Sequence, residues 1–350
     1  MKKKVGIFVV VMGLAASVYG IQELDWFQGP SSVEVYHAPK LVSRRSGDFT
    51  ANIVGALGGG GKELKYRLND GPWSDVGRGG NRMPFPLFNV ELFGDELRPG
   101  LNTLVLKTIP SESEQENVTL DFEYDPKPIR LPIRVDWATT ELDVQDGIWE
   151  TFSVDGEWRV RPKPGAENYD RLLAVTGAFP EGRRVETDII FRNYSDGSRP
   201  YGFGILPLWG GHPDNENVRP RRGWNFSLAW YYSHYEGVGM EFSYKNGKEE
   251  PEWISTYRPF KPKPGVRYHL IVDVWPEFDE KGRHSRYKQR MKWYAEGETI
   301  PYDWMEITDV EGSPIPEGEY GVALVAHRSQ VEFGPIVVTP LEGQTVNKRI

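Results

Sequence analysis

The 350-residue chain has no cysteine, so disulfide bonds cannot contribute to its stability and its folded state must be held by its core alone. Long hydrophobic runs are also absent after the first 20 residues, so we expect no transmembrane segment. Positive charge is not in excess either. The net charge is −8, which disfavours nucleic acid and anionic membranes as partners over the whole surface.

The N-terminal stretch "MKKKVGIFVVVMGLAASVYG" has the layout of a secretory signal peptide. Three lysines precede an apolar run from Val5 to Ala16, and small residues suited to cleavage follow. We therefore assign residues 1–20 to a cleaved signal peptide and expect a secreted or periplasmic protein. Loss of the three lysines would lower the net charge from −8 to −11.

An apolar period of 3.6 residues almost never persists along the chain. Apolar and polar residues instead alternate in short runs, with Gly, Pro, Asn or Asp between the runs. This pattern predicts an all-β protein. Between residues 31 and 124 about seven short strands are expected, and Asn69-Asp70-Gly71 is a strong hairpin-turn signal because its residues tolerate positive φ angles. That number and spacing of strands is typical of an immunoglobulin-like β-sandwich.

A proline-rich connector, "DPKPIRLPIRVDW", separates this set from a second one. The second set contains ten or more longer strands rich in Trp and Tyr, which predicts two large stacked sheets, a jelly roll. The predicted organisation is a signal peptide (1–20), an immunoglobulin-like sandwich (21–126), a linker (127–134), a jelly roll (135–342) and a C-terminal tail (343–350).

Several motifs of the second half resemble the concanavalin A-like lectin and glucanase sandwich. They are "ELDVQDGIWETFSVDGEWRVRP", "RRVETDIIFRNY" and "YGVALVAHRSQVEFGPIVVTPL". The motifs "YRLNDGPW" and "LRPGLNTLVLKT" of the first half resemble bacterial immunoglobulin-like modules. The resemblance implies a concanavalin A-like jelly roll behind an immunoglobulin-like module. Because that fold is shared by lectins, glycoside hydrolases, polysaccharide lyases and adhesion modules, it does not choose among these functions.

The segment "VETDIIF" contains the first candidate site. Glu186 and Asp188 alternate with apolar residues, so both carboxylates point to one face of a strand. Retaining glucanases of the resembled fold carry ExDxE or ExDxxE here, and the third carboxylate is missing from this chain. Two carboxyl groups can still serve hydrolysis of a glycosidic bond if they lie close enough together.

The aromatic stretch "GWNFSLAWYYSHYEG" contains the second candidate site. On a strand, one face carries Trp224, Phe226, Leu228, Trp230 and Tyr232, which we expect to pack between the sheets. Tyr231, His234 and Tyr235 remain for the exposed, concave face, where flat rings with polar edges can stack on sugars.

The loop "PLWGGHPDNENVRPRRGW" and a strand end supply the remaining candidates. We expect Trp209, His212 and Arg221 to be ligand-binding because binding residues concentrate on long loops and the planar arginine fork suits carboxylates or sulfates. Asp214 to Asn217 offer hard oxygen donors, so calcium is conceivable, although no metal or other cofactor is otherwise indicated. His327, after an apolar strand, is a candidate base or sugar ligand.

Three functions remain open from sequence. The first is a secreted, non-catalytic protein that binds a polysaccharide or oligosaccharide. The second is a polysaccharide-degrading enzyme: a hydrolase using Glu186 and Asp188, or a lyase using Arg192 or Arg221 to neutralise a uronate with Tyr231 or His234 as base. The third is an envelope or adhesion module. The sequence contains no zinc, nucleotide-binding or serine-hydrolase motif.

Overall fold

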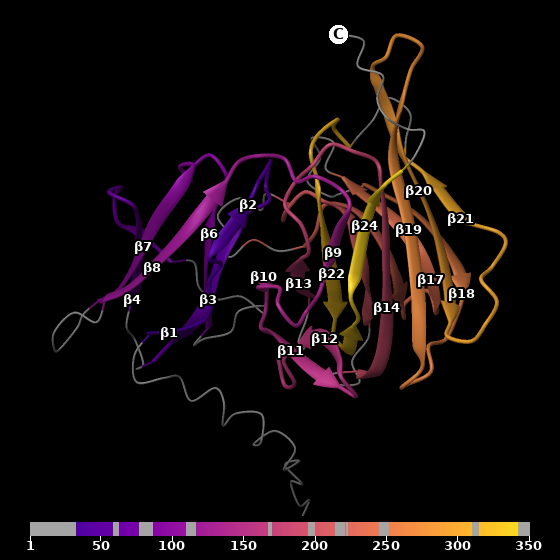
Figure 1. Ribbon diagram of the computed structural model, residues 1–350, viewed down its shortest axis with the longest axis horizontal. Coiled ribbons are helices and arrows are strands. Elements are labelled where there is room, and N and C mark those ends of the chain that lie inside the picture. The colour runs from indigo at the N-terminus through magenta and orange to yellow at the C-terminus, as the bar shows by residue number, and fades with distance from the viewer. Residues whose placement is uncertain are drawn as a thin grey trace, which may run out of the picture.

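The computed structural model describes residues 33–58, 63–76, 87–109, 117–166, 170–194, 200–213, 221, 223–244, 252–309 and 315–341. No helix occurs among these residues, which confirms the prediction of an all-β fold, and four sheets stack as two sandwiches (Figure 1). The described part of the chain accordingly offers no helix that could cross a bilayer. The predicted signal peptide, C-terminal tail and calcium loop (214–217) lie outside the described residues.

The N-terminal sandwich consists of a three-stranded and a five-stranded sheet. The three-stranded sheet contains, in spatial order, β1 (Val33–His37), β3 (Ala51–Leu57) and β6 (Leu87–Leu92). The five-stranded sheet contains β2 (Leu41–Ser43), β8 (Asn117–Asp125), β7 (Gly100–Ile109), β4 (Glu63–Leu68) and β5 (Ser74–Asp75). One apolar core lies between them, to which Ile53 and Val90 contribute from one sheet and Leu104 and Phe122 from the other.

The predicted hairpin turn connects β4 to β5. The Gly71 N–H donates to the Leu68 carbonyl at 3.0 Å, and Asn69 has a φ of 51°. Asparagine tolerates this left-handed conformation better than most residues. The sequence prediction of a turn here is confirmed.

The C-terminal sandwich consists of a seven-stranded and a nine-stranded sheet. The seven-stranded sheet contains, in order, β10 (Asp143–Asp146), β13 (Asp170–Ala174), β22 (Gly321–His327), β15 (Gly202–Trp209), β16 (Phe226–Tyr232), β17 (Gly237–Tyr244) and β18 (Glu252–Pro259). The nine-stranded sheet contains β11 (Trp149–Val154), β12 (Glu157–Pro162), β23 (Ser329–Phe333), β14 (Arg183–Tyr194), β19 (Arg267–Phe278), β20 (His284–Ala295) and β21 (Met305–Thr308), with β24 (Ile336–Pro340) beside β14 and β9 (Ile133–Val135) beside β24.

Strand β14 is a central strand of the nine-stranded sheet. It pairs with β19 along one edge and with β24 and then β23 along the other. Alternation along β14 sends Val185, Ile189 and Phe191 into the core between the two sheets. Because β9 pairs with β24, residues 133 and 134 of the proline-rich connector are strand residues of this sheet.

The two sandwiches share a buried junction. Phe49 of the first is fully buried against Trp209 of β15, with ring centroids 6.0 Å apart, and Val54 on β3 belongs to the core of the second sandwich. Polar contacts border these rings. The Asn52 side chain donates to the Gln145 side-chain oxygen at 3.0 Å. The first sandwich therefore packs directly on the second, as the side-by-side ribbons in Figure 1 show.

A histidine on β1 makes this junction sensitive to pH. The backbone N–H of Trp149 donates to Nε2 of His37 at 3.2 Å, so the imidazole must be neutral to accept. Burial, with a smaller contribution from the positive charge of Lys163, lowers the pKa of His37 to about 4. In the unfolded chain the pKa of histidine is about 6.5.

We expect wild-type protein to lose stability as the pH falls from 6.5 to 4. The unfolded state binds the proton over this range and the folded state does not, so up to about 3 kcal/mol of unfolding free energy is lost. Denaturant unfolding of wild type and His37→Gln at several pH values isolates the effect, because glutamine can accept the same hydrogen bond without titrating. A constant difference between the two proteins across this range would contradict the account.

Candidate functional site

The candidate site lies on the outer face of the seven-stranded sheet, the face turned away from the nine-stranded sheet. Antiparallel pairing aligns Asp170, His327, Gly202, Tyr232 and Gly237 in one row across five strands. The adjacent row contains Leu172, Val325, Gly204, Trp230, Gly239 and Tyr257. Residues from β13 to β18, up to 157 positions apart in sequence, thus converge at one end of this face.

Glycines in these rows leave space for large rings. A Cβ atom on Gly202 would lie 2.6 Å from the Trp230 ring, and one on Gly239 would lie 2.5 Å from the Tyr257 ring. Real Cβ contacts are never so short. The Trp230 and Tyr257 rings therefore occupy the volume that side chains at these positions would take, and glycine is required beneath them.

The rings form what we call the aromatic cluster: Trp230, Tyr232, His234, Tyr235 and Tyr257. Trp230 and Tyr232 stack with centroids 4.3 Å apart and planes 13° apart. Tyr235 contacts Tyr257 at 4.3 Å and His234 at 5.0 Å. Trp230 is 5% exposed, whereas Tyr235 is 51% exposed. The cluster therefore has a buried base and an open ring at its surface.

The turn between β16 and β17, which carries His234 and Tyr235, is anchored on both sides. The Ser233 hydroxyl accepts from the Tyr201 N–H at 2.9 Å, and the Ser233 N–H donates to the Tyr201 carbonyl at 2.9 Å. On the far side, the Phe260 N–H donates to the Glu236 carbonyl at 3.0 Å. The backbone thus holds the exposed Tyr235 in a defined position.

A buried carboxylate lies beneath the rings. The indole N–H of Trp230 donates to the Tyr257 hydroxyl oxygen at 2.7 Å, and that hydroxyl donates to Glu241. Burial raises the pKa of Glu241, which is 6% exposed. Burial and the adjacent Glu241 raise the pKa of Tyr257 as well, so its hydroxyl keeps its proton at neutral pH.

A second buried pair closes the other side of the cluster. His327 Nδ1 lies 2.5 Å from Asp170 Oδ1, and both side chains are about one-tenth exposed. The Tyr232 ring lies 6.5 Å from the imidazole. Burial first, then the charges of Glu241 and Asp170, raise the pKa of Tyr232 to about 12. The end of the sheet therefore combines the carboxylates of Glu241 and Asp170 with two histidines and protonated tyrosines.

Toward the first sandwich this outer face is closed. An apolar cluster that includes Phe49, Trp209, Trp224, Leu206 and Leu228 covers it. Leu206 and Leu228 are fully buried. The expectation of an exposed concave sheet face is therefore wrong for most of its length, because the first sandwich and the rings around Trp209 fill it. Among the described residues of this face, the end with Tyr235 is open.

The predicted faces of β16 are reversed from Leu228 onward, whereas Phe226 packs against the core between the sheets, as predicted. Tyr231 lies in the core between the sheets, 5.5 Å from Phe203, whereas Trp224, Leu228 and Trp230 belong to the outer-face cluster. The expectation that Tyr231 contacts ligand is therefore wrong. Both faces of this strand are covered, so apolar content could not show which face is the core.

Three predicted ligand-binding residues lie at the junction. Trp209 is fully buried, and His212 beside it has Nδ1 2.6 Å from the Gly223 carbonyl. Arg221 forms an ion pair with Asp48 at 2.5 Å, and its backbone N–H donates to Glu91. The structure thus places them between the sandwiches, away from His234, Tyr235 and His327, which the aromatic cluster and its neighbours bring together.

The remaining three predicted residues lie on the outer face of the other sheet. Glu186 and Asp188 point outward, as expected, into a hollow of about 320 Å³ that His269 and Tyr294 also line. Arg192 forms two hydrogen bonds of 2.7 Å to Glu332. These residues do not converge with His234, so the structure does not assemble the predicted lyase set.

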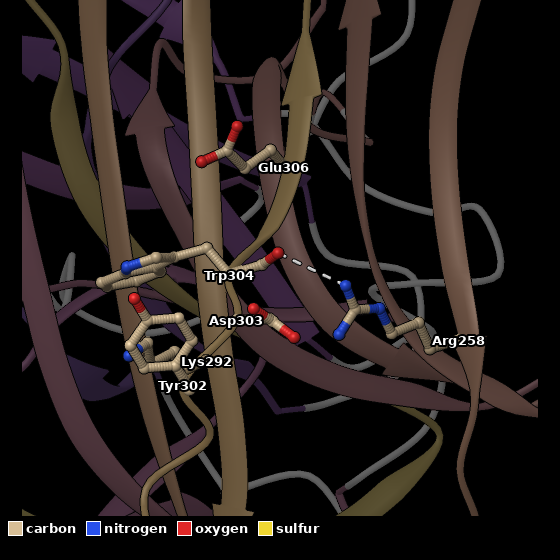
Figure 2. A pocket seen from close by; sticks show the side chains of 6 residues that line it. All are labelled: Arg258, Lys292, Tyr302, Asp303, Trp304 and Glu306. Atoms are coloured by element: carbon tan, nitrogen blue, oxygen red, sulfur yellow. Dashed lines mark hydrogen bonds between the residues drawn. The ribbon is translucent and has the colours of Figure 1, made fainter.

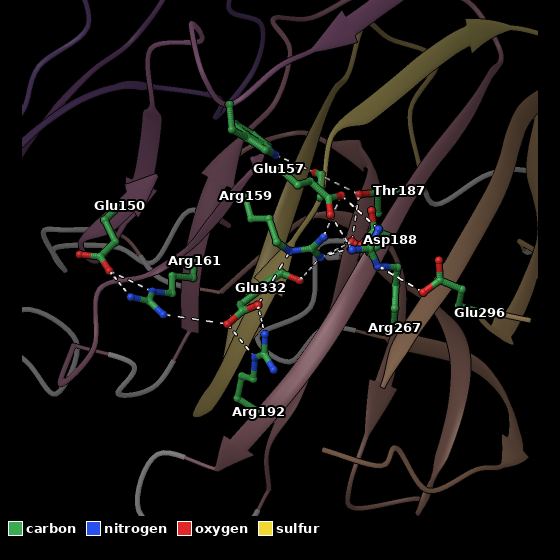
Figure 3. A network of polar contacts seen from close by, with 12 residues as sticks. Glu150, Glu157, Arg159, Arg161, Thr187, Asp188, Arg192, Arg267, Glu296 and Glu332 are labelled. Carbon is green, nitrogen blue, oxygen red and sulfur yellow. Dashed lines mark hydrogen bonds and ion pairs between the residues drawn. The ribbon is translucent and has the colours of Figure 1, made fainter. Parts of the chain in front are cut away.

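Asp188 belongs to a network of ion pairs centred on Arg159 (Figure 3). The Arg159 side chain is 2% exposed, with Nη2 2.6 Å from Asp188 Oδ1 and Glu157 and Glu332 on its other sides. The Asp188 carboxylate also lies against Gly334, where a Cβ would be 2.0 Å from Oδ2. This environment gives Asp188 a structural role as the partner of a buried cation.

Substitution should show that Asp188 and Glu186 contribute differently to stability. We expect Asp188→Ala to lower the unfolding free energy by about 3 kcal/mol or more, because it leaves a buried arginine with one fewer partner. Glu186→Ala should change it by no more than about 0.5 kcal/mol, since that side chain is 46% exposed with only a 3.9 Å contact to Arg184. Equal effects of the two substitutions in denaturant unfolding would refute the structural role of Asp188.

Sequence reasoning missed Asp170, Glu241 and Tyr257 and assigned Trp230 and Tyr232 to the core between the sheets. The one available signal was Glu241, a single acid between Met240 and Phe242 in an apolar strand. No sequence motif identifies Asp170 or Tyr257. Among the described residues no group of three or more His, Asp or Glu side chains is placed to hold a metal ion.

Comparisons with known proteins do not show a family. No family model matches the chain. A leucine–tRNA ligase of Pseudoalteromonas atlantica is 28% identical over an alignment of 144 residues, and the match covers 39% of this chain and 15% of the ligase. The chain therefore covers only a small part of that relative's length, and the ligase activity is not transferred to it.

Solved structures of low similarity were also found. A carbohydrate-binding module, CBM66 from Bacillus subtilis, is 14% identical, covers 57% of this chain and 94% of its own, and gives a TM-score of 0.32. The endo-β-1,4-glucuronan lyase of Trichoderma reesei is 9% identical, with 61% and 96% coverage and a TM-score of 0.38. The Emp46p carbohydrate recognition domain is 12% identical, with 55% and 87% coverage and a TM-score of 0.32. Scores this low transfer no function, so function is argued from the site.

Proposed function

We propose that the protein binds a polysaccharide at the aromatic cluster, on the open end of the outer face of the seven-stranded sheet. The observation that carries the proposal is the half-exposed Tyr235 ring on an anchored turn, directly above buried polar groups. An aromatic ring offers a flat apolar surface to the C–H face of a pyranose, and its hydroxyl offers a hydrogen bond to the edge. Adjacent carboxylates, tyrosines and a histidine are suitable partners for sugar hydroxyls.

Packing alone does not account for the polar groups. The core of the sandwich lies on the opposite face of this sheet, where Tyr231, Met240 and Phe242 are buried. Burial of Glu241 and of the Asp170–His327 pair costs free energy that an apolar cluster would not incur. Buried ionisable groups gathered next to an opening are typical of binding and catalytic sites.

The charge of the site favours a neutral sugar. Glu241 and Asp170 are acidic, and the chain as a whole has a net charge of −8. Such a surface repels polyanions such as uronate or sulfated polysaccharides.

We further propose that the chain is exported after loss of residues 1–20, and that the N-terminal sandwich is an immunoglobulin-like spacer that carries the binding sandwich.

Replacement of Tyr235 tests this proposal. We expect Tyr235→Ala to weaken binding to a neutral polysaccharide about tenfold, the equivalent of about 1.4 kcal/mol for one lost stacking ring. Affinity electrophoresis against soluble β-glucan, xylan, galactomannan and starch measures the binding of each variant. Trp158→Ala is the matched control, since Trp158 is 40% exposed on β12 of the other sheet.

Retention of wild type on none of these polymers would refute glycan binding. Equal binding by wild type and Tyr235→Ala would show that the aromatic cluster is not where the polymer binds.

Cleavage of the bound polysaccharide is the second candidate function, favoured by the Asp170–His327 pair. A carboxylate on Nδ1 fixes the orientation and tautomer of an imidazole, as a general acid or base requires. In this reading His327 is the catalytic base, a role that the sequence analysis left open for it, and Asp170 is its orienting partner in place of the predicted Glu186 and Asp188.

His327→Ala separates the two functions. If the protein is an enzyme, wild type releases new reducing ends, and His327→Ala reduces the release at least a hundredfold while affinity electrophoresis still shows retention. Retention by wild type without any product would limit the function to binding.

A further inference from the structure

A second hollow lined by aromatic rings lies where the edge strands of the two sheets meet, on the far side of β18 from the aromatic cluster. Its volume is about 730 Å³, and it is lined by Arg258, Lys292, Tyr302, Asp303, Trp304 and Glu306. We call it the Trp304 hollow. Arg258 follows Tyr257 of the aromatic cluster directly along β18, so the two sites adjoin across one strand.

The Trp304 ring is held in place by cations of the nine-stranded sheet. Arg290 lies 4.3 Å, Lys292 4.6 Å and Arg184 5.6 Å from the ring centre. Arg184 and Arg290 are themselves fixed, because both donate to the fully buried Asp273 at 2.7–2.9 Å. Because Asp273 holds these cations in place, their cation–π contacts fix the position of the indole ring.

A second ring stands free beside it. Tyr302 is 94% exposed, which makes it the most exposed of the large apolar side chains in the described part of the chain. In Figure 2 the Tyr302 and Trp304 rings lie on one side of the hollow and Arg258 on the other, with the Asp303 carboxylate between them. The Arg258 guanidinium donates to the Trp304 carbonyl at 3.3 Å. An aromatic wall thus faces a polar wall.

The polar groups of the hollow are available to a ligand. Within the described part of the chain, neither the Asp303 nor the Glu306 carboxylate forms a hydrogen bond or ion pair, and the Lys292 ammonium contacts the Trp304 ring. Two cations and two carboxylates line the hollow, so its formal charge is balanced. Balanced donors and acceptors suit uncharged hydroxyl groups better than a carboxylate or a sulfate.

We propose that the Trp304 hollow is a second binding site for a neutral sugar residue, in which Tyr302 and Trp304 stack on the pyranose and Asp303, Glu306 and Lys292 bond its hydroxyls. This inference rests on the proposed glycan binding and extends it to a second subsite. Two adjoining sites on one molecule can engage one polymer, and linked binding events raise the affinity without new contacts. The protein should therefore prefer polymers to short oligosaccharides.

Tyr302→Ala is the direct test, because so exposed a side chain can be removed without disturbing the fold. Affinity electrophoresis of the full chain uses the neutral polymer that wild type binds among β-glucan, xylan, galactomannan and starch. We expect Tyr302→Ala to weaken polymer binding about tenfold and Tyr235→Ala to weaken it independently. Ile300→Ala, 52% exposed in the same segment, is the matched control and should bind as wild type does.

The outcomes distinguish the two proposals. If Tyr235→Ala weakens binding and Tyr302→Ala does not, the proposed sugar site in the Trp304 hollow is overturned, while the proposed site at the aromatic cluster is supported. If Tyr302→Ala alone weakens binding, the site in the hollow is supported and the site at the aromatic cluster is overturned. Equal losses in Tyr302→Ala and Ile300→Ala would indicate an apolar contact surface, such as one for a protein partner, and would overturn the sugar site.

Discussion

The architecture depends on the burial of both faces of the seven-stranded sheet. One face packs on the nine-stranded sheet, and most of the other is closed by Phe49 of the first sandwich and the rings around Trp209. In the described part of the chain, the end of the outer face that carries Tyr235 stays open. The first sandwich thus covers part of the outer face of the seven-stranded sheet, and this contact determines which part of the face a ligand can reach.

Buried charges serve two purposes in this fold. On the nine-stranded sheet, Arg159 is surrounded by carboxylates, and the network of ion pairs connects neighbouring strands. On the seven-stranded sheet, Glu241 and the Asp170–His327 pair lie beneath exposed rings. The first arrangement is typical of a structural ion-pair network, and the second of a site kept polar for a ligand.

Local pattern predicted much of the fold. Alternation predicted an all-β chain, the residues Asn69-Asp70-Gly71 predicted their turn, and the spacing of Glu186 and Asp188 predicted that both point to one face of a strand. These features depend on neighbours within a few residues, which the sequence displays directly.

The site depends on long-range pairing and could not be found in this way. Asp170 meets His327 only through the pairing of β13 with β22, and Glu241 meets Tyr257 only across the pairing of β17 with β18. The face that β16 presents to the core was also undetermined, because both of its faces are covered. Of the predicted residues, only His234, Tyr235 and His327 lie at the site.

Hydrogen exchange of backbone amides, measured with and without a bound neutral polysaccharide, tests the central claim most directly. If the polymer binds at the open end of the seven-stranded sheet, protection should increase at the turn that carries Tyr235 and at the β22–β23 turn beside His327. Protection confined to the N-terminal sandwich, or to the Arg159 network, would contradict this account.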